Sequence, residues 1–341
     1  MGATVLSFGE LLLRVCPDAG GQWLQDNTLS FYVGGAEANV ATALALWGVD
    51  SAYFTALPEN LLSRQLTGYL AGKNIDVSRI LYQGNRVGLY YLTKGKDLKN
   101  AGVIYDRDHS SFSALEPGSI DWDAVYKGIG WLHFSAISPA LNSRVAAVCE
   151  EALREASARN IMISVDLNYR AKLWQYGVSP DQVMPGLVQY CDLIMGNLWA
   201  AEKMLGIPVD AGIGPESSKE DYLQHARRTS EQITKLFPKA KIVANTFRFD
   251  DGPTGIRYYT TLYTGGELYH SREYTAPAIV DKVGSGDCFM AGLIYGYVRK
   301  RSTPEILEFA TAAAFQKLFI TSDATNQKAE ETEKFIRTYE G

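Results

Sequence analysis

The stretch DKVGSGDCFMAGLIYG occupies residues 281–296 and places three small residues before an acid and an apolar helix. A helix that needs only a cap requires one Ser or Asp, whereas this stretch sets Gly284, Ser285 and Gly286 before Asp287. The first N–H groups of a helix are unpaired and partially positive, and small residues let an anion approach them. The stretch therefore predicts an anion pocket. The alternative is a glycine-rich helix start in which Asp287 serves only as a cap.

Asp287 falls in the first turn of this helix, where the helix dipole favours its charge. A carboxylate beside an anion pocket suits phosphoryl transfer, because the N–H groups hold the transferring phosphate while the acid accepts the proton of the attacking hydroxyl. The expected chemistry is therefore general-base catalysis by Asp287.

A second glycine motif, GGAEANVA, begins at Gly34-Gly35 and opens a helix expected from about Ala36 to Gly48. The two glycines allow a ligand to approach the backbone closely. Asn39 lies inside the helix, where its amide can face a polyol hydroxyl. The alternative is a buried Asn that is satisfied by protein partners.

Composition narrows the class of protein. The chain has 341 residues, 46% of them hydrophobic, and a net charge of −5, which favours a sizeable core and argues against a broad nucleic-acid footprint. The N-terminus does not resemble a signal peptide, and no apolar run is long enough for a membrane span. The four cysteines form no CxxC pair. We expect a cytoplasmic protein with no membrane or nucleic-acid partner.

Strands and helices alternate along most of the chain, which predicts a parallel sheet with helices on both faces. Residues 4–15 are expected to form one buried strand. Residues 85–112 are expected to form a hairpin which, with extended residues at about 12–33, makes a small separate sheet. A later hairpin turns at Thr264, Gly265 and Gly266. The whole chain, 1–341, is expected to be one domain.

The two glycine motifs together resemble those of the ribokinase-like (PfkB) carbohydrate kinases. That family carries a GG…N signature followed by D-x-x-G-x-G-D, which here correspond to Gly34-Gly35…Asn39 and Asp281…Asp287. The resemblance implies a three-layer α/β/α sandwich with a mostly parallel sheet and a small β-sheet lid over the sugar. It also implies ATP and Mg²⁺ as cofactors, Asp287 as base, and a homodimer or higher oligomer formed through the lid.

Within this family the chain is most similar to the 2-keto-3-deoxygluconate kinases, which phosphorylate the terminal hydroxyl of an acid sugar. The resemblance implies sugar contacts for Gly34, Gly35 and Asn39 and for five further residues: Tyr90, Tyr105, Arg107, Arg170 and Asp323. Two arginines suit a carboxylate substrate, because guanidinium and carboxylate pair in a bidentate manner.

Each of these residues also has a purely structural interpretation. Arg107 has Asp106 and Asp108 as neighbouring ion-pair partners, and Arg170 has Asp166. The two tyrosines are equally interpretable as ordinary cross-strand aromatic residues.

The motifs that contact the nucleotide in this family are only partly present in this chain. In the usual Asn-x-x-Glu motif, Asn197 is present but Ala200 replaces Glu, and Glu202 follows two places later. A two-residue shift turns a side chain by about 200° around a helix, so Glu202 is expected on the surface. Asn197 is expected to order Mg²⁺ through water.

The usual glycine loop after the late strand is also absent, which leaves Thr246 and Arg248, with Gly284 and Gly286, as expected nucleotide contacts. Two alternatives therefore remain open: a kinase of another hexose or ketose such as fructose, and a sugar- or nucleotide-binding sensor without catalysis. A dinucleotide-binding oxidoreductase is not favoured, because no glycine fingerprint follows the first strand.

Overall fold

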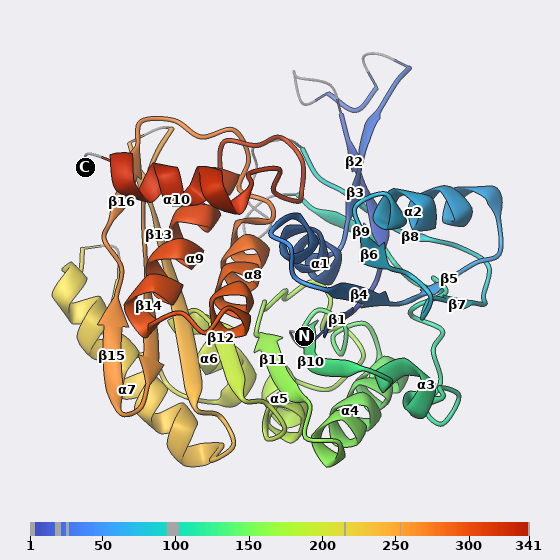
Figure 1. The fold of residues 1–341 in the computed structure, drawn as a ribbon, viewed down its shortest axis with the longest axis horizontal. Coiled ribbons are helices and arrows are strands. Elements are labelled where there is room, and N and C mark those ends of the chain that lie inside the picture. The colour runs from blue at the N-terminus through green and yellow to red at the C-terminus, as the bar shows by residue number, and fades with distance from the viewer. Residues whose placement is uncertain are drawn as a thin grey trace.

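A mixed ten-stranded sheet forms the centre of the molecule within the described residues, which are 4–17, 22–24, 27–93, 102–214, 216–252 and 254–339 of this computed structural model (Figure 1). The strands lie in the order β15 (Glu267–His270), β14 (Gly255–Thr264), β13 (Ile242–Asp251), β12 (Leu193–Gly196), β11 (Met162–Asp166), β10 (Ile129–Ser135), β1 (Thr4–Phe8), β4 (Ser51–Phe54) and β6 (Ile75–Asp76), and β16 (Tyr274–Ala276) pairs with β14. All pairs from β13 to β6 are parallel, whereas β14 pairs antiparallel with β13, β15 and β16.

Helices cover both faces of this sheet. One face carries α1 (Ala36–Leu46), α8 (Ser285–Val298), α9 (Thr303–Lys317) and α10 (Ala329–Thr338). The other carries α3 (Trp122–Tyr126), α4 (Ser143–Ala158), α5 (Pro180–Val188), α6 (Leu198–Leu205) and α7 (Lys219–Leu236). The helix α2 (Leu61–Ala71) packs near β6, and the short strands β5 (Ala56–Leu57) and β7 (Leu81–Tyr82) pair separately. The predicted three-layer α/β/α architecture is confirmed.

Each helical layer buries its own hydrophobic cluster against the sheet. The helix α8 is apolar around nearly its whole circumference because it lies in the interior, in one cluster with α1 and α9. The amphipathic helix α7 instead begins with a capping box at Ser218 and Asp221 and exposes its charged face. No helix in the described ranges has the length and apolar character needed to cross a bilayer.

A separate four-stranded sheet forms the lid. Its order is β3 (Ser30–Gly34), β2 (Leu12–Cys16), β8 (Gly88–Tyr91) and β9 (Ile104–Asp106). The pair β8–β9 is antiparallel, as predicted, and the predicted turn between them lies in residues 94–101, outside the described residues. In Figure 1, β2 and β3 project from the body of the molecule.

Two boundaries differ from the sequence-based expectation. Residues 4–15 form two strands in different sheets, because the chain leaves the central sheet after β1 and enters the lid as β2. Gly9 follows β1 directly, at the point where the chain leaves the central sheet. Glu37 packs so closely on it that a Cβ at Gly9 would lie 2.1 Å from the Glu37 carboxylate. The second difference is at Phe112, which is fully buried in the main core, so the lid sheet ends before the predicted residue 112.

Candidate active site

A cavity of about 820 Å³ lies between the lid and the carboxyl ends of the central strands. Its wall combines Tyr90 and Tyr105 from the lid, Asp166 and Asn197 at the ends of β11 and β12, and Asp287 from α8. Ligands of parallel α/β proteins bind outside the carboxyl ends of the strands, so the cavity occupies the expected place for a binding site.

The N-terminus of α8 lies at the wall of this cavity. Gly284 is the N-cap in a left-handed conformation (φ 79°), and Ser285, Gly286 and Asp287 form the first turn. All four residues line the cavity. Because the first N–H groups of a helix are unpaired and partially positive, this arrangement is chemically suited to an anion.

Gly284 is required by two separate features of its surroundings. Its φ is positive, and a Cβ there would lie 1.8 Å from the Asp323 carbonyl oxygen. We expect Gly284→Ala to lower the free energy of unfolding by more than about 3 kcal/mol, measured by urea titration. Gly206→Ala is the matched control, because Gly206 also has a left-handed φ (68°) but an added Cβ would meet nothing within 4 Å. The control should cost only about 1 kcal/mol, and equal losses at both positions would contradict the steric explanation.

Asp287 is almost fully buried, and burial is the main reason that its pKa is raised to about 8. The Asn39 amide donates a hydrogen bond to Asp287 Oδ2 at 2.7 Å, which lowers this pKa in part. The negative charges of Asp166 and Glu37 raise it further, and Arg170 lowers it. Asn39 therefore contacts the carboxylate directly, and both side chains reach the cavity.

The raised pKa of Asp287 makes protein stability depend on pH. Because the folded-state pKa, about 8, lies above the unfolded value, the folded protein holds a proton that the unfolded chain has lost between about pH 4 and 8. The contribution of this proton to the free energy of unfolding is fully present below the pKa of Asp287 in the unfolded chain. It is lost as the pH rises through the pKa of Asp287 in the folded protein. We expect Asp287→Asn to match the wild type near about pH 4 and to be more stable by on the order of 1–3 kcal/mol near about pH 9. Urea unfolding at both pH values tests this, and a difference independent of pH would contradict it.

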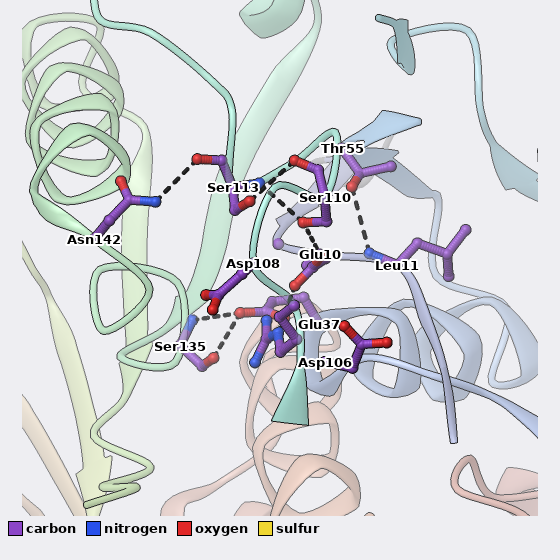
Figure 2. Close-up of polar contacts among 12 residues, drawn as sticks. Glu10, Leu11, Glu37, Thr55, Asp106, Asp108, Ser110, Ser113, Ser135 and Asn142 are labelled. Atoms are coloured by element: carbon purple, nitrogen blue, oxygen red, sulfur yellow. Dashed lines mark hydrogen bonds and ion pairs between the residues drawn. The ribbon is translucent and has the colours of Figure 1, made fainter. Parts of the chain in front are cut away.

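Arg107 reaches the cavity from the end of β9 and is paired with a residue that the sequence did not single out. Its Nε donates to Glu10 Oε2 at 2.5 Å, and both side chains are almost fully buried. Ser110 donates to the other oxygen of Glu10, as Figure 2 shows. The anticipated partner Asp106 pairs instead with Arg86 at 2.8 Å.

Glu37, in the first turn of α1, is the second unforeseen carboxylate in this wall. Its Oε1 accepts hydrogen bonds from the Ser135 N–H at 2.9 Å and from the Ser135 hydroxyl at 2.6 Å (Figure 2). Burial raises its pKa to about 6 despite these bonds. Glu37 therefore joins the start of α1 to the end of β10 through hydrogen bonds.

The lid tyrosines and Arg170 face the same cavity. The rings of Tyr90 and Tyr105 lie 6.5 Å apart across the β8–β9 pair, so they are cross-strand neighbours as well as wall residues. Arg170 is half-buried and donates to the Tyr169 carbonyl at 3.0 Å.

The cavity also contains the residues predicted to contact nucleotide. Asn197, Thr246 and Arg248 all line it, near the aromatic rings of Trp199 and Phe249.

Asn197 also caps α6, since its Oδ1 accepts the Ala200 N–H at 2.8 Å. Among the described residues, no group of three or more His, Cys, Asp or Glu side chains is placed to hold a metal ion. The cavity wall offers the side-chain oxygens of Asn197 and Asp166, which fit the oxygen preference of Mg²⁺, an ion that phosphate oxygens and water usually hold.

Three predicted or discussed residues lie off the cavity wall. Asp323 is buried behind it, where it accepts the Tyr90 hydroxyl at 2.7 Å and pairs with Arg14 Nε at 3.0 Å. Gly34 lies beside Asp323, since a Cβ at Gly34 would be 3.0 Å from Asp323 Oδ2. Glu202 accepts the Val209 N–H at 3.3 Å outside the cavity, consistent with its expected surface position.

The residues missed by sequence reasoning are charged groups inside apolar runs. Glu10 and Arg14 bracket the leucines of ELLLRV, and Glu37 stands in an alanine-rich helix. Buried charges almost always have partners, so a charge in an apolar run signals a distant partner without naming it.

The fold is the ribokinase-like α/β fold, and it carries a lid-covered cavity with a helix N-terminus and a carboxylate. A family model described as pfkB family carbohydrate kinase matches residues 3–329. The chain belongs to the PfkB family of carbohydrate kinases.

Two proteins named as 2-dehydro-3-deoxygalactonokinase and 2-dehydro-3-deoxygluconokinase are similar to nearly the whole chain. The 2-dehydro-3-deoxygalactonokinase of Haloferax volcanii is 25% identical, over 99% of this chain and 98% of its own length. The crystal structure of 2-dehydro-3-deoxygluconokinase from Thermotoga maritima is 33% identical with a TM-score of 0.89, covering 98% of this chain and 99% of that one. A structure of an Escherichia coli protein described as a putative ribokinase II, in complex with ATP and Mg²⁺, shares the fold at 17% identity and a TM-score of 0.76, covering 99% of this chain and 100% of that one.

Proposed function

We propose that this carbohydrate kinase transfers the γ-phosphoryl group of ATP to the terminal hydroxyl of 2-keto-3-deoxygluconate. The observation that carries the proposal is the position of Asp287, in the first turn of α8 and at the wall of a cavity that extends from the lid tyrosines to the nucleotide end. A sensor would need no buried carboxylate at this point, and its burial is costly.

In the proposed reaction, Asp287 accepts the proton of the terminal hydroxyl as that oxygen forms a bond to the γ-phosphorus. The bond from the γ-phosphorus to the bridging oxygen of ADP breaks, and ADP leaves. The N–H groups of Gly284, Ser285 and Gly286 stabilise charge on the transferring group. The hydrogen bond from Asn39 orients the carboxylate that accepts the proton.

The sugar is proposed to lie under the lid with its carboxylate on Arg170. Arg170 is half-buried at the wall, whereas Arg107 is already compensated by Glu10. The remaining donors of Arg107 and the Tyr105 hydroxyl would bind the keto and hydroxyl oxygens. The Tyr90 hydroxyl, which donates to Asp323, would accept a hydrogen bond from a sugar hydroxyl. The names of the relatives from Haloferax volcanii and Thermotoga maritima support an acid sugar of this class.

At the other end, Asn197, Thr246 and Arg248 are proposed to contact the ATP phosphates. Mg²⁺, when bound, would neutralise charge on the β- and γ-phosphates, with Asn197 reaching it through water. Oligomerisation through the lid stays a prediction.

A substrate panel tests the proposal. ATP consumption is measured with 2-keto-3-deoxygluconate, 2-keto-3-deoxygalactonate, fructose and ribose. We expect kcat/KM for an acid sugar to exceed that for either neutral sugar by at least about 10²-fold, because only the acid sugar uses the guanidinium group. Turnover with neutral sugars alone would contradict the acid-sugar assignment while leaving the kinase assignment intact.

A further inference from the structure

A cluster of buried charges joins the lid to the anion bend, residues 280–286. Arg14, on the lid strand β2, donates from Nη2 to Asp281 Oδ2 at 2.8 Å, and its Nε lies 3.0 Å from Asp323 Oδ1. All three side chains are 0% exposed. Arg14 Nη2 also lies 3.3 Å from the Thr321 carbonyl oxygen, so one lid residue holds two separate segments of the C-terminal region.

A second lid strand reaches the same place. The Tyr90 hydroxyl, on β8, donates to Asp323 Oδ2 at 2.7 Å, so both carboxylate oxygens of Asp323 face lid residues. Because β2 and β8 are neighbouring parallel strands, the centre of the lid is attached to Asp323 at two points.

The two carboxylates flank the anion bend itself. Asp281 Oδ1 accepts the Val283 N–H at 3.1 Å inside the bend. The N–H groups of Val280 and Asp281 both donate to the Leu318 carbonyl, at 2.8 and 3.0 Å. On the other flank, the Asp323 carbonyl oxygen packs so closely on Gly284 that it leaves no room for a Cβ. The backbone around both carboxylates therefore sets the course of the bend.

Electrostatics make Arg14 hard to replace. Lys317 is also buried and donates to the Ile320 carbonyl at 3.1 Å, so two cations balance Asp281 and Asp323 in this cluster. Removing one partner of a buried ion pair leaves an uncompensated charge, which draws in water or shifts the backbone. At this position a backbone shift moves the N–H groups of the anion bend.

We propose that Arg14 is a positioning residue for phosphoryl transfer, which holds the anion bend through Asp281 and Asp323 and couples its geometry to the lid. This inference rests on the proposed function of the bend. Arg14 does not line the cavity, and it acts by keeping the amides of Gly284, Ser285 and Gly286 aligned with the transferring group.

The test compares three variants with the full-length wild type. Arg14→Lys keeps the positive charge but loses the guanidinium group, whose separate nitrogen atoms reach both carboxylates. Asp323→Asn keeps the shape of the side chain but loses its negative charge. Arg86→Met is the control, since it breaks another Arg–Asp pair of the lid, Arg86–Asp106, which is more than one-third exposed and distant from the bend in sequence. Steady-state kinetics on the best substrate and hydrogen–deuterium exchange of the free protein are measured for each.

For Arg14→Lys and Asp323→Asn we expect kcat to fall at least about tenfold while KM for the sugar changes less than about threefold, because misaligned amides affect the transition state most. Exchange should rise in residues 280–287 and not across the central sheet. The control should stay within about twofold of the wild type in kcat, with unchanged exchange in the bend.

The proposal is overturned if both variants keep kcat within about twofold of the wild type, or if exchange rises uniformly without a local effect at the bend. Hydrogen–deuterium exchange is measured on the free protein, so its result does not depend on whether the enzyme turns over a sugar. If the wild type phosphorylates no sugar, the proposed function fails, and the exchange result still decides whether Arg14 holds the bend.

Discussion

Asp287→Asn is expected to lower kcat by at least about 10³-fold while the protein remains folded. The amide has nearly the shape of the carboxylate and remains able to bond to Asn39, but it does not accept the hydroxyl proton. Because Asp287 is buried with a raised pKa, its replacement should not destabilise the fold. Coupled measurement of ADP formation and of thermal unfolding separates lost chemistry from lost structure.

Asp221→Asn provides the matched control. Asp221 occupies the third position of α7, the same helix position as Asp287 in α8. It is exposed, and its carboxylate accepts the Ser218 N–H in the capping box of α7. Its replacement should leave kcat within about twofold of the wild type. A fully active Asp287→Asn variant would show that Asp287 is not the base.

The wild-type rate should also follow the ionisation of Asp287. Because the base must be deprotonated, kcat/KM is expected to rise up to tenfold per pH unit and to level off above about pH 8. This slope should disappear in the residual activity of Asp287→Asn.

Arg170→Met is expected to reduce kcat/KM for the acid sugar by about 10²- to 10³-fold, mainly through KM. A guanidinium–carboxylate pair at a partly buried wall is a strong, charge-assisted contact, and its loss leaves the substrate carboxylate poorly solvated. Activity with a neutral sugar, where detectable, should change by less than about threefold. Kinetics with both sugars on one protein preparation make this comparison.

Arg107→Met serves as the contrast to Arg170→Met. Arg107 is paired with buried Glu10, so its removal should lower the free energy of unfolding by about 3 kcal/mol, whereas Arg170→Met should change stability little.

An equal loss of acid-sugar and neutral-sugar activity in Arg170→Met would rule out a carboxylate contact at this position.

The parts of the fold that sequence could predict are those encoded locally. The alternation of strands and helices, the helix from Ala36 and the glycine bend before α8 each follow from residues close together in the chain. The division of residues 4–15 between two sheets was not predictable in this way, because an apolar run looks alike in either sheet.

The candidate site shows the same limit. Most predicted residues gather at one cavity because their motifs lie at the carboxyl ends of the strands. The pairing of Arg107 with Glu10, 97 residues away, depends on how the lid folds back on the core. Asp323 lies behind the wall because a lid arginine and a lid tyrosine hold it there, which no local pattern records.

The most direct test of the proposed mechanism is ³¹P NMR of the product formed from ATP and 2-keto-3-deoxygluconate. The mechanism predicts a new phosphate monoester whose phosphorus couples to the two protons of the terminal carbon, in an amount equal to the ADP formed. With Asp287→Asn this ester should accumulate at least about 10³-fold more slowly. Formation of ADP and inorganic phosphate alone, or an ester at another carbon, would contradict transfer to the terminal hydroxyl.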